Sequence, residues 1–150
     1  MINNLNLSKS KVPVKGFMQK NVATISSGSS IKEAAKIMYE KKIGSLVIED
    51  GGELRGIVTE RDISRSLFVY DVPSDSRVKD IYSTPLVSVD PDSSILDAAD
   101  MISKTQILRI PVIKDGKLLG IISATDLAVL FSMFENEELE KKLGPYVSEL

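Results

Sequence analysis

The chain has 150 residues, of which 43% are hydrophobic and 27% are charged, and its formal net charge at pH 7 is −2. These values indicate a soluble globular protein of one ordinary domain or two very small ones, and they exclude a global basic field that would collect nucleic acid or anionic lipid. Cysteine and histidine are both absent, which excludes disulfides and zinc-thiolate sites and makes catalysis an unfavourable interpretation, since histidine is the usual general base.

The first residues, 1–13, are interpreted as a solvated N-terminal tail. They carry Lys9 and Lys11 without an acidic residue, and they lack the continuous apolar segment of a signal peptide. Nowhere in the chain do about 18 apolar residues follow one another, as a membrane-spanning helix would require. We therefore expect a cytoplasmic protein with no membrane partner.

The rest of the chain contains an internal duplication. Shifting the sequence by 120 − 56 = 64 positions aligns residues 14–67 with residues 78–131 without a gap, and a unit of this length is larger than a solenoid repeat. We predict two repeats, residues 14–70 and 78–133, joined by a linker at 71–77. Because the linker is short and contains a proline, the repeats should pack together as one pseudo-twofold body.

Within each repeat the expected order of elements is β-α-β-β-α. A short strand and a polar loop precede a helix whose apolar residues recur at i, i+3, i+4 and i+7. Two strands joined by an Asp-Gly turn then form a hairpin, and a second helix begins at about Glu60 or Ala124. The predicted strands are 22–25, 45–48 and 54–58 in the first repeat and 86–89, 110–113 and 118–122 in the second, and the helical stripes are Ile31, Ala34, Ala35, Met38 and Ile95, Ala98, Ala99, Ile102. The predicted fold class is therefore mixed α/β (α+β).

The last helix is expected to run beyond the second repeat. A C-terminal helix extension, residues 134–150, continues its apolar pattern until Gly144 and Pro145 stop it. These apolar side chains either form a surface for a partner or cover the core of the protein itself, and the sequence leaves both interpretations open.

A related heptapeptide occurs at the end of both hairpins. Residues 56–62 are GIVTERD and residues 120–126 are GIISATD. One interpretation is helix capping, because Thr-x-x-Asp and Ser-x-x-Asp are variants of the capping box, and residues 30–33 and 94–97 open the other two helices in the same way. The alternative is a ligand site. Each helix starts directly after a strand, where its amides and dipole favour a phosphate, and an aspartate in the first turn can accept hydrogen bonds from a ribose diol. The preceding glycine allows the backbone to approach closely.

The duplicated unit that ends in this motif resembles a tandem pair of CBS domains, the cystathionine-β-synthase-type repeats that form a Bateman module. The resemblance covers about residues 14–131. It implies two clefts between the repeats that bind adenosine compounds such as AMP, ADP, ATP or S-adenosylmethionine as regulatory ligands, with no required cofactor. It also implies a sensor rather than an enzyme, often a homodimer, that acts on a separate effector protein.

Carried over to this sequence, the resemblance implies that Asp62 and Asp126 hold ribose hydroxyls and that Thr59 and Ser123 meet ribose or phosphate. The base would lie against backbone and aliphatic groups of the first two strands of each repeat. The resemblance implies neither a catalytic residue nor a metal ligand. The full candidate set for ligand binding is Asn21, Val22, Ala23, Gly44, Ser45, Thr59, Arg61, Asp62, Leu86, Val87, Arg109, Ile110, Ser123, Thr125 and Asp126.

The two copies of the motif differ in charge. The first contains Glu60 and Arg61 where the second contains Ala124 and Thr125. We therefore predict that the Asp62 cleft binds phosphate more tightly than the Asp126 cleft does. The alternative is that Arg61 is only an exposed charge on the helix. The second repeat has its own cation in Arg109, which is placed to serve either cleft. The main alternative function is a self-associating interaction scaffold with vestigial clefts, and nucleic-acid binding has little support because both repeats are nearly neutral.

Overall fold

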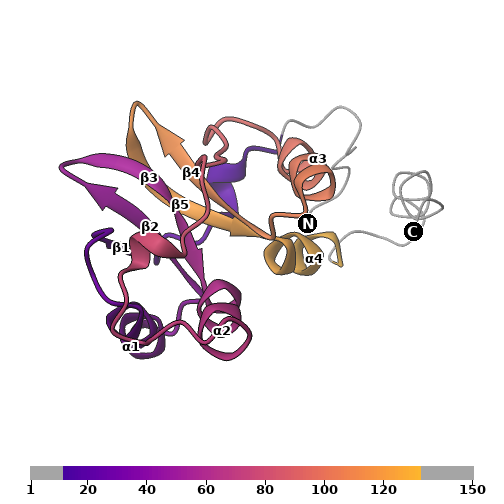
Figure 1. The fold of residues 1–150 in the computed structure, drawn as a ribbon. Helices are drawn as coiled ribbons and strands as arrows, with labels where there is room; N and C mark the ends of the chain where they lie inside the picture. Colours follow the sequence, from indigo (N-terminus) through magenta and orange to yellow (C-terminus); the bar gives the residue numbers. More distant parts are fainter. Residues whose placement is uncertain (1–11, 133–150) are drawn as a thin grey trace.

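Each repeat forms a β-hairpin with two helices in the computed structural model of the protein, which describes residues 12–132. The mixed α/β fold with two related repeats is thereby confirmed, and Figure 1 shows α1 and α2 together in one part of the molecule and α3 and α4 in another. The first repeat contains β1 (Thr24–Ile25), α1 (Ile31–Lys41), β2 (Ser45–Asp50), β3 (Glu53–Thr59) and α2 (Glu60–Phe68). The second contains α3 (Ile95–Thr105), β4 (Arg109–Lys114), β5 (Lys117–Ser123) and α4 (Ala124–Phe131), and short 3-10 helices lie at Val14–Gly16 and Val78–Asp80.

The two hairpins form where the Asp-Gly signals predict them. Strands β2 and β3 pair in antiparallel fashion up to Asp50 and Glu53, and β4 and β5 pair up to Lys114 and Lys117. The connecting residues adopt positive φ, at Gly51 and Gly52 in the first turn and at Asp115 and Gly116 in the second. Such angles favour glycine and tolerate aspartate, which explains why these residue types mark the turns.

The α-helices α1 to α4 each follow a Ser or Thr whose hydroxyl accepts a hydrogen bond from the backbone N–H three residues later. At Thr59, Ser94 and Ser123 the aspartate at that third position also accepts from the backbone N–H of the cap residue, so the capping box is complete. In α1 only the first of these bonds is present, from Glu33 N–H to the Ser30 hydroxyl at 3.0 Å. The capping interpretation of the motif is therefore correct, and it leaves open whether the same carboxylates also bind a ligand.

The predicted first strand of each repeat is too long, and in the second repeat the prediction is wrong. Strand β1 contains two residues, which pair in parallel with β2, while residues 86–89 form only an isolated bridge between Val89 and Val112. Pro111 is the physical reason. At the equivalent position in the first repeat, Val47 N–H donates to the Ala23 carbonyl at 3.0 Å, but proline has no N–H to donate to the corresponding carbonyl of Val87.

The first segment of each sequence repeat packs against the other repeat. Val12 and Val14 are buried in the core of the second repeat, and the backbone N–H of Val14 donates to Ser93 O at 2.7 Å. Val78 is buried in the core of the first repeat, and its N–H donates to Ser29 O at 2.8 Å. Figure 1 shows the indigo segment beside the orange strands β4 and β5. The two repeats therefore complete each other's hydrophobic cores.

The motif glycines make room for these first segments, residues 14–19 and 78–83, which we call the crossing segments. A methyl group on Gly120 would lie 2.7 Å from the Gln19 carbonyl oxygen, and one on Gly56 would meet the Ser83 carbonyl and lie 2.5 Å from the Tyr82 ring. The close backbone approach predicted at these glycines is real, but the approaching backbone belongs to the protein itself. Each crossing segment is thereby held beside the end of the strand that leads into the motif.

The predicted helix extension at residues 134–150 and residues 1–11 of the predicted tail lie outside the described residues. The tail was expected to be solvated up to residue 13, but Val12 is buried, because it packs into the core of the second repeat. Within the described part, α4 ends at Phe131 with Leu127 and Leu130 buried against its own repeat. None of the helices in residues 12–132 is long and apolar enough to cross a membrane.

Candidate ligand clefts

Two clefts lie between the repeats, and each contains one copy of the motif. The cleft that contains Asp62 has a volume of about 200 Å³ and is lined by Ile57, Thr59, Arg61, Asp62, Arg65, Ser83, Pro85, Val87, Gln106, Ile107, Leu108 and Arg109. The cleft that contains Asp126 has a volume of about 300 Å³ and is lined by Gln19, Asn21, Val22, Lys42, Ile43, Gly44, Ser45, Arg109, Ile121, Ser123 and Asp126. Most positions in one list have their 64-residue counterpart in the other, so the clefts are pseudo-symmetric.

The motif aspartates are held in the same way in both clefts. One oxygen of Asp62, Oδ2, accepts hydrogen bonds from the backbone N–H and the hydroxyl of Thr59, both at 2.9 Å. The Oδ2 atom of Asp126 accepts from the N–H of Ser123 at 2.9 Å and from its hydroxyl at 2.8 Å. Each carboxylate is therefore held through its Oδ2 atom. The groups near Oδ1 then decide whether that second oxygen is available to a ligand.

The start of each motif helix is tied to the residue that precedes the first strand of its hairpin, at the open end where the two strands are paired. Glu60 N–H donates to Gly44 O at 3.1 Å, and Ala124 N–H donates to Leu108 O at 2.9 Å. These bonds hold the residues just before β2 and β4 against the helix N-termini. Gly44 lines the Asp126 cleft and Leu108 lines the Asp62 cleft, so each bond joins a residue that lines one cleft to the motif helix of the other.

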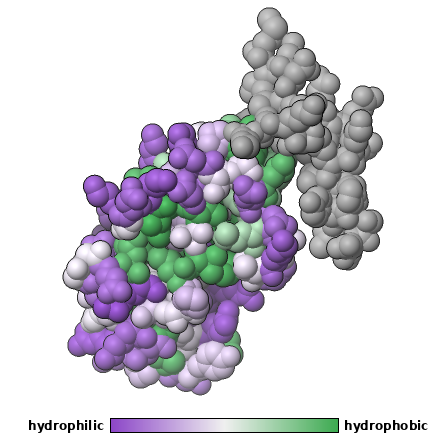
Figure 2. All heavy atoms as spheres, turned by 90° about the horizontal axis from the view of Figure 1, so that it is seen from above, coloured by the Kyte–Doolittle hydropathy of each residue, from purple (hydrophilic) through white to green (hydrophobic). Residues whose placement is uncertain are grey.

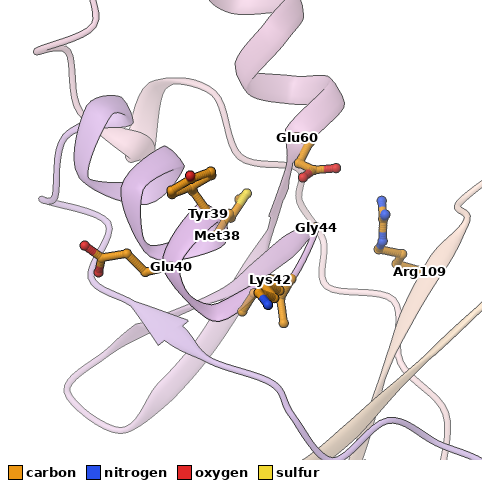
Figure 3. A pocket seen from close by; sticks show the side chains of 8 residues that line it. Met38, Tyr39, Glu40, Lys42, Gly44, Glu60 and Arg109 are labelled. Carbon is orange, nitrogen blue, oxygen red and sulfur yellow. The ribbon is translucent and has the colours of Figure 1, made fainter.

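Arg109 projects from β4 to the junction of the two clefts and lines both. A methyl group on Gly44 would lie 2.5 Å from its guanidinium and 3.2 Å from the Glu60 carboxylate. Figure 3 shows Arg109 and Glu60 reaching from different elements toward the same hollow, which Tyr39 and Lys42 also line. The absence of a side chain at Gly44 is therefore what allows this arginine to cross from one repeat to the other.

The clefts differ in positive charge. Arg61, Arg65 and Arg109 line the Asp62 cleft, whereas Lys42 and Arg109 are the cationic residues that line the Asp126 cleft. An anionic group in the first cleft would meet more guanidinium groups, which bind phosphate in bidentate geometry. Among residues 12–132, no group of three or more acidic, histidine or cysteine side chains is arranged to hold a metal ion.

Most of the predicted ligand-binding residues lie in the two clefts. Four of the predicted residues are not among those that line them: Ala23, Leu86, Ile110 and Thr125. Ile110 is fully buried in the core of the second repeat, because strand residues alternate between the two faces and its side chain points away from the cleft. Thr125 lies on the exposed side of α4.

Several cleft residues escaped the prediction, among them Gln19, Lys42, Arg65, Ser83 and Gln106. Gln19 and Ser83 belong to the crossing segments, whose partner repeat cannot be seen in the sequence. The signal that could have found them is the 64-residue alignment itself, because it places Gln19 opposite Ser83 and Lys42 opposite Gln106. Gln19 is of particular interest because its amide nitrogen donates to Asp126 Oδ1 at 3.1 Å.

Comparison with known proteins agrees with this architecture. The sequence pattern of the CBS domain matches residues 14–69 and 78–132. The CBS domain-containing protein YhcV of Bacillus subtilis is 35% identical over 116 residues, which make up 77% of this chain and 83% of YhcV. A homoserine O-acetyltransferase of Methanohalobium evestigatum is 33% identical over 132 residues, but the match spans only 26% of that longer protein.

Solved structures share the fold as well. The CBS domain pair of protein MJ0100, crystallised in complex with 5-methylthioadenosine and S-adenosyl-L-methionine, superposes with a TM-score of 0.73 at 31% identity. The superposition covers 80% of this chain and 99% of that one.

Proposed function

The chain belongs to the family of CBS-domain proteins, and from this premise we propose that it is a non-catalytic regulatory module that binds adenosine nucleotides and signals to a separate partner. The observation that carries the proposal is the pair of pseudo-symmetric clefts, each with a fixed aspartate beside a hydroxyl residue. A carboxylate held in this way can accept both hydroxyls of a ribose. The adenosine compounds bound by the MJ0100 domain pair support this class of ligand.

The walls of the clefts suit a purine base. Ile57 and Ile107 in one cleft, and Val22 and Ile121 in the other, offer flat aliphatic contacts. Backbone groups of the irregular segments beside them can donate to and accept from the base edge. An aromatic stacking partner is not needed when aliphatic side chains cover both faces of the ring.

The Asp62 cleft is proposed to take the phosphorylated ligand. Arg61 lies in the first turn of α2 and Arg65 in its last turn, and both line this cleft together with Arg109. Their positive charge favours AMP, ADP or ATP over an uncharged nucleoside. The Asp126 cleft has fewer cations, so phosphate should contribute less to binding there.

Isothermal titration of the full chain with AMP, ATP and S-adenosylmethionine tests the proposal. We expect Asp62→Asn to weaken AMP binding by about tenfold or more, because a hydrogen bond to a charged group is worth about 1.5–3 kcal/mol. Arg61→Ala should weaken ATP binding more than the binding of S-adenosylmethionine, which has no phosphate. Asp97→Asn is the matched control, since Asp97 closes the same kind of capping box at α3 without lining either cleft.

The alternative function is an interaction scaffold, and one observation favours it. Exposed apolar side chains occur on α1 and at the end of α2 and just after it, at Tyr39, Phe68, Val69 and Tyr70. Apolar atoms also gather at the centre of another part of the surface, the upper face that Figure 2 shows from above. Such a surface supports self-association, for example as a homodimer. If AMP, ATP and S-adenosylmethionine all fail to bind while the chain self-associates, the interaction scaffold is the better description of the protein.

A further inference from the structure

We propose that Gln19 determines which of the two clefts an adenosine ligand fills first, by occupying the ribose-binding oxygen of Asp126. The Asp62 cleft has no such competitor. This inference rests on the proposed function, because it concerns the ribose in the same clefts. It adds a specificity-determining residue and an order of filling.

The two aspartates differ at one atom. In the second cleft, Oδ2 of Asp126 is held by Ser123 and Oδ1 accepts the hydrogen bond from Gln19 Nε2 at 3.1 Å. In the first cleft, Oδ2 of Asp62 is held by Thr59 in the same way, but within residues 12–132 no donor bonds to its Oδ1. A ribose diol that approaches Asp62 therefore finds an acceptor that is free, and one that approaches Asp126 does not.

The backbone fixes Gln19 in this position. Its N–H donates to Ile121 O at 2.8 Å and its carbonyl accepts from Ile121 N–H at 2.9 Å, two residues before the motif serine. The equivalent residue, Ser83, makes the same pair of bonds with Ile57, at 2.9 and 3.3 Å. Ser83 thus takes the place in the first cleft that Gln19 takes in the second, but it has no side-chain amide, and the hydrogen bonds to the Asp62 carboxylate within residues 12–132 come from Thr59.

The size of the effect follows from the type of bond. A ligand in the second cleft must displace an amide donor from the carboxylate. Because this bond is exposed to solvent, we expect it to lie at the lower end of the range for hydrogen bonds to charged groups, a several-fold to about tenfold difference in the dissociation constant. Because glutamine is uncharged, the effect should be the same for adenosine and AMP. That distinguishes it from the arginines, whose effect depends on phosphate.

A reciprocal exchange of the two residues tests the proposal in the full chain, with adenosine and AMP as titrants. The second cleft is measured alone in an Asp62→Asn background, and the first in an Asp126→Asn background. We expect Gln19→Ser to tighten binding in the second cleft about three- to tenfold for both titrants. We expect Ser83→Gln to weaken binding in the first cleft by a similar factor.

Lys20→Ser, titrated with adenosine, is the control. Lys20 follows Gln19 directly and is exposed, but it lines neither cleft, so its replacement should leave affinity in the second cleft unchanged. Unchanged or weaker binding in Gln19→Ser would overturn the inference alone, provided that the parent protein binds. If neither adenosine nor AMP binds to any form of the protein, the inference and the proposed function both fail.

Discussion

At the scale of single residues, Gly56 sets how closely the segment that contains Tyr82 and Ser83 approaches β3. A Cβ atom at this position would collide with the backbone of Ser83 and lie 2.5 Å from the Tyr82 ring, and neither the strand nor the crossing segment can easily move. We expect Gly56→Ala to lower the free energy of unfolding by about 1–3 kcal/mol, as overpacking in a close-packed core typically does. Urea denaturation measures this change.

Gly28→Ala is the matched control for this prediction. Its new methyl group would lie 3.7 Å from the Ser26 hydroxyl, an ordinary contact, and Gly28 does not have positive φ. Stability should therefore change little. Equal losses in the two variants would contradict the steric explanation for Gly56.

The same residues show what sequence reasoning could and could not reach. The repeated glycine, the hydroxyl residue and the aspartate were visible because they recur at the same spacing, and their local geometry follows from capping. The hydrogen bond from Gln19 to Asp126 was not visible, because it joins residues 107 positions apart. Only the fold brings that amide to the carboxylate.

At the scale of elements, a polar contact ties the loop before each first helix to the end of the neighbouring strand. In the second repeat, Lys114 Nζ donates to Asp90 Oδ2 at 3.0 Å. Hydrogen bonds from the Asp92 backbone and from Lys114 lower the pKa of Asp90, and the hydrogen bond with Asp90 raises the pKa of Lys114. In the first repeat Asp50 takes the equivalent position, and hydrogen bonds from Ser27 lower its pKa.

These shifts predict a pH window for the stability that the Asp90–Lys114 pair contributes. A lowered carboxyl pKa means that the contribution is present above the ordinary value of 3.8 and is lost as pH falls through the folded pKa. A raised lysine pKa means that it is present below 10.5 and is lost as pH rises through the folded pKa. We expect Lys114→Met to lower the urea midpoint at neutral pH, and the difference from the parent protein to vanish at both extremes.

Lys117→Met controls for the loss of one positive charge from the same hairpin. Lys117 is exposed, and it forms no ion pair with any residue in the described range. Its replacement should therefore cause no loss of stability that depends on pH. A difference between Lys114→Met and the parent that persists at acid pH would assign the effect to packing of the lysine stem.

The elements also mark where prediction from sequence failed. Helices and hairpins were found because each carries its own local signal in caps, turns and periodicity. The strand expected at residues 86–89 failed because its partner strand contains Pro111, and whether a strand forms depends on the donors of its neighbour. The proline was visible in the sequence, but the pairing that gives it meaning was not.

At the scale of the whole molecule, the crossing segments make each hydrophobic core depend on both repeats. The sequence could not show this, since Val14 and Val78 are identical residues at equivalent positions and each would fit either core. Because each repeat contributes a segment to the core of the other, neither repeat can unfold without exposing part of the other repeat's core. The molecule should therefore unfold as one cooperative unit although it contains two sheets.

Val14→Ala tests this cooperativity, because Val14 belongs to the first repeat in sequence and is fully buried in the core of the second. Removing its two methyl groups should lower stability by roughly 2 kcal/mol. Native-state hydrogen exchange should then show the same loss of protection for the most protected amides of β2 and β4. Val129→Ala, at a residue that is 54% exposed on α4, should change neither set, and a loss confined to β4 after Val14→Ala would mean that the repeats unfold independently.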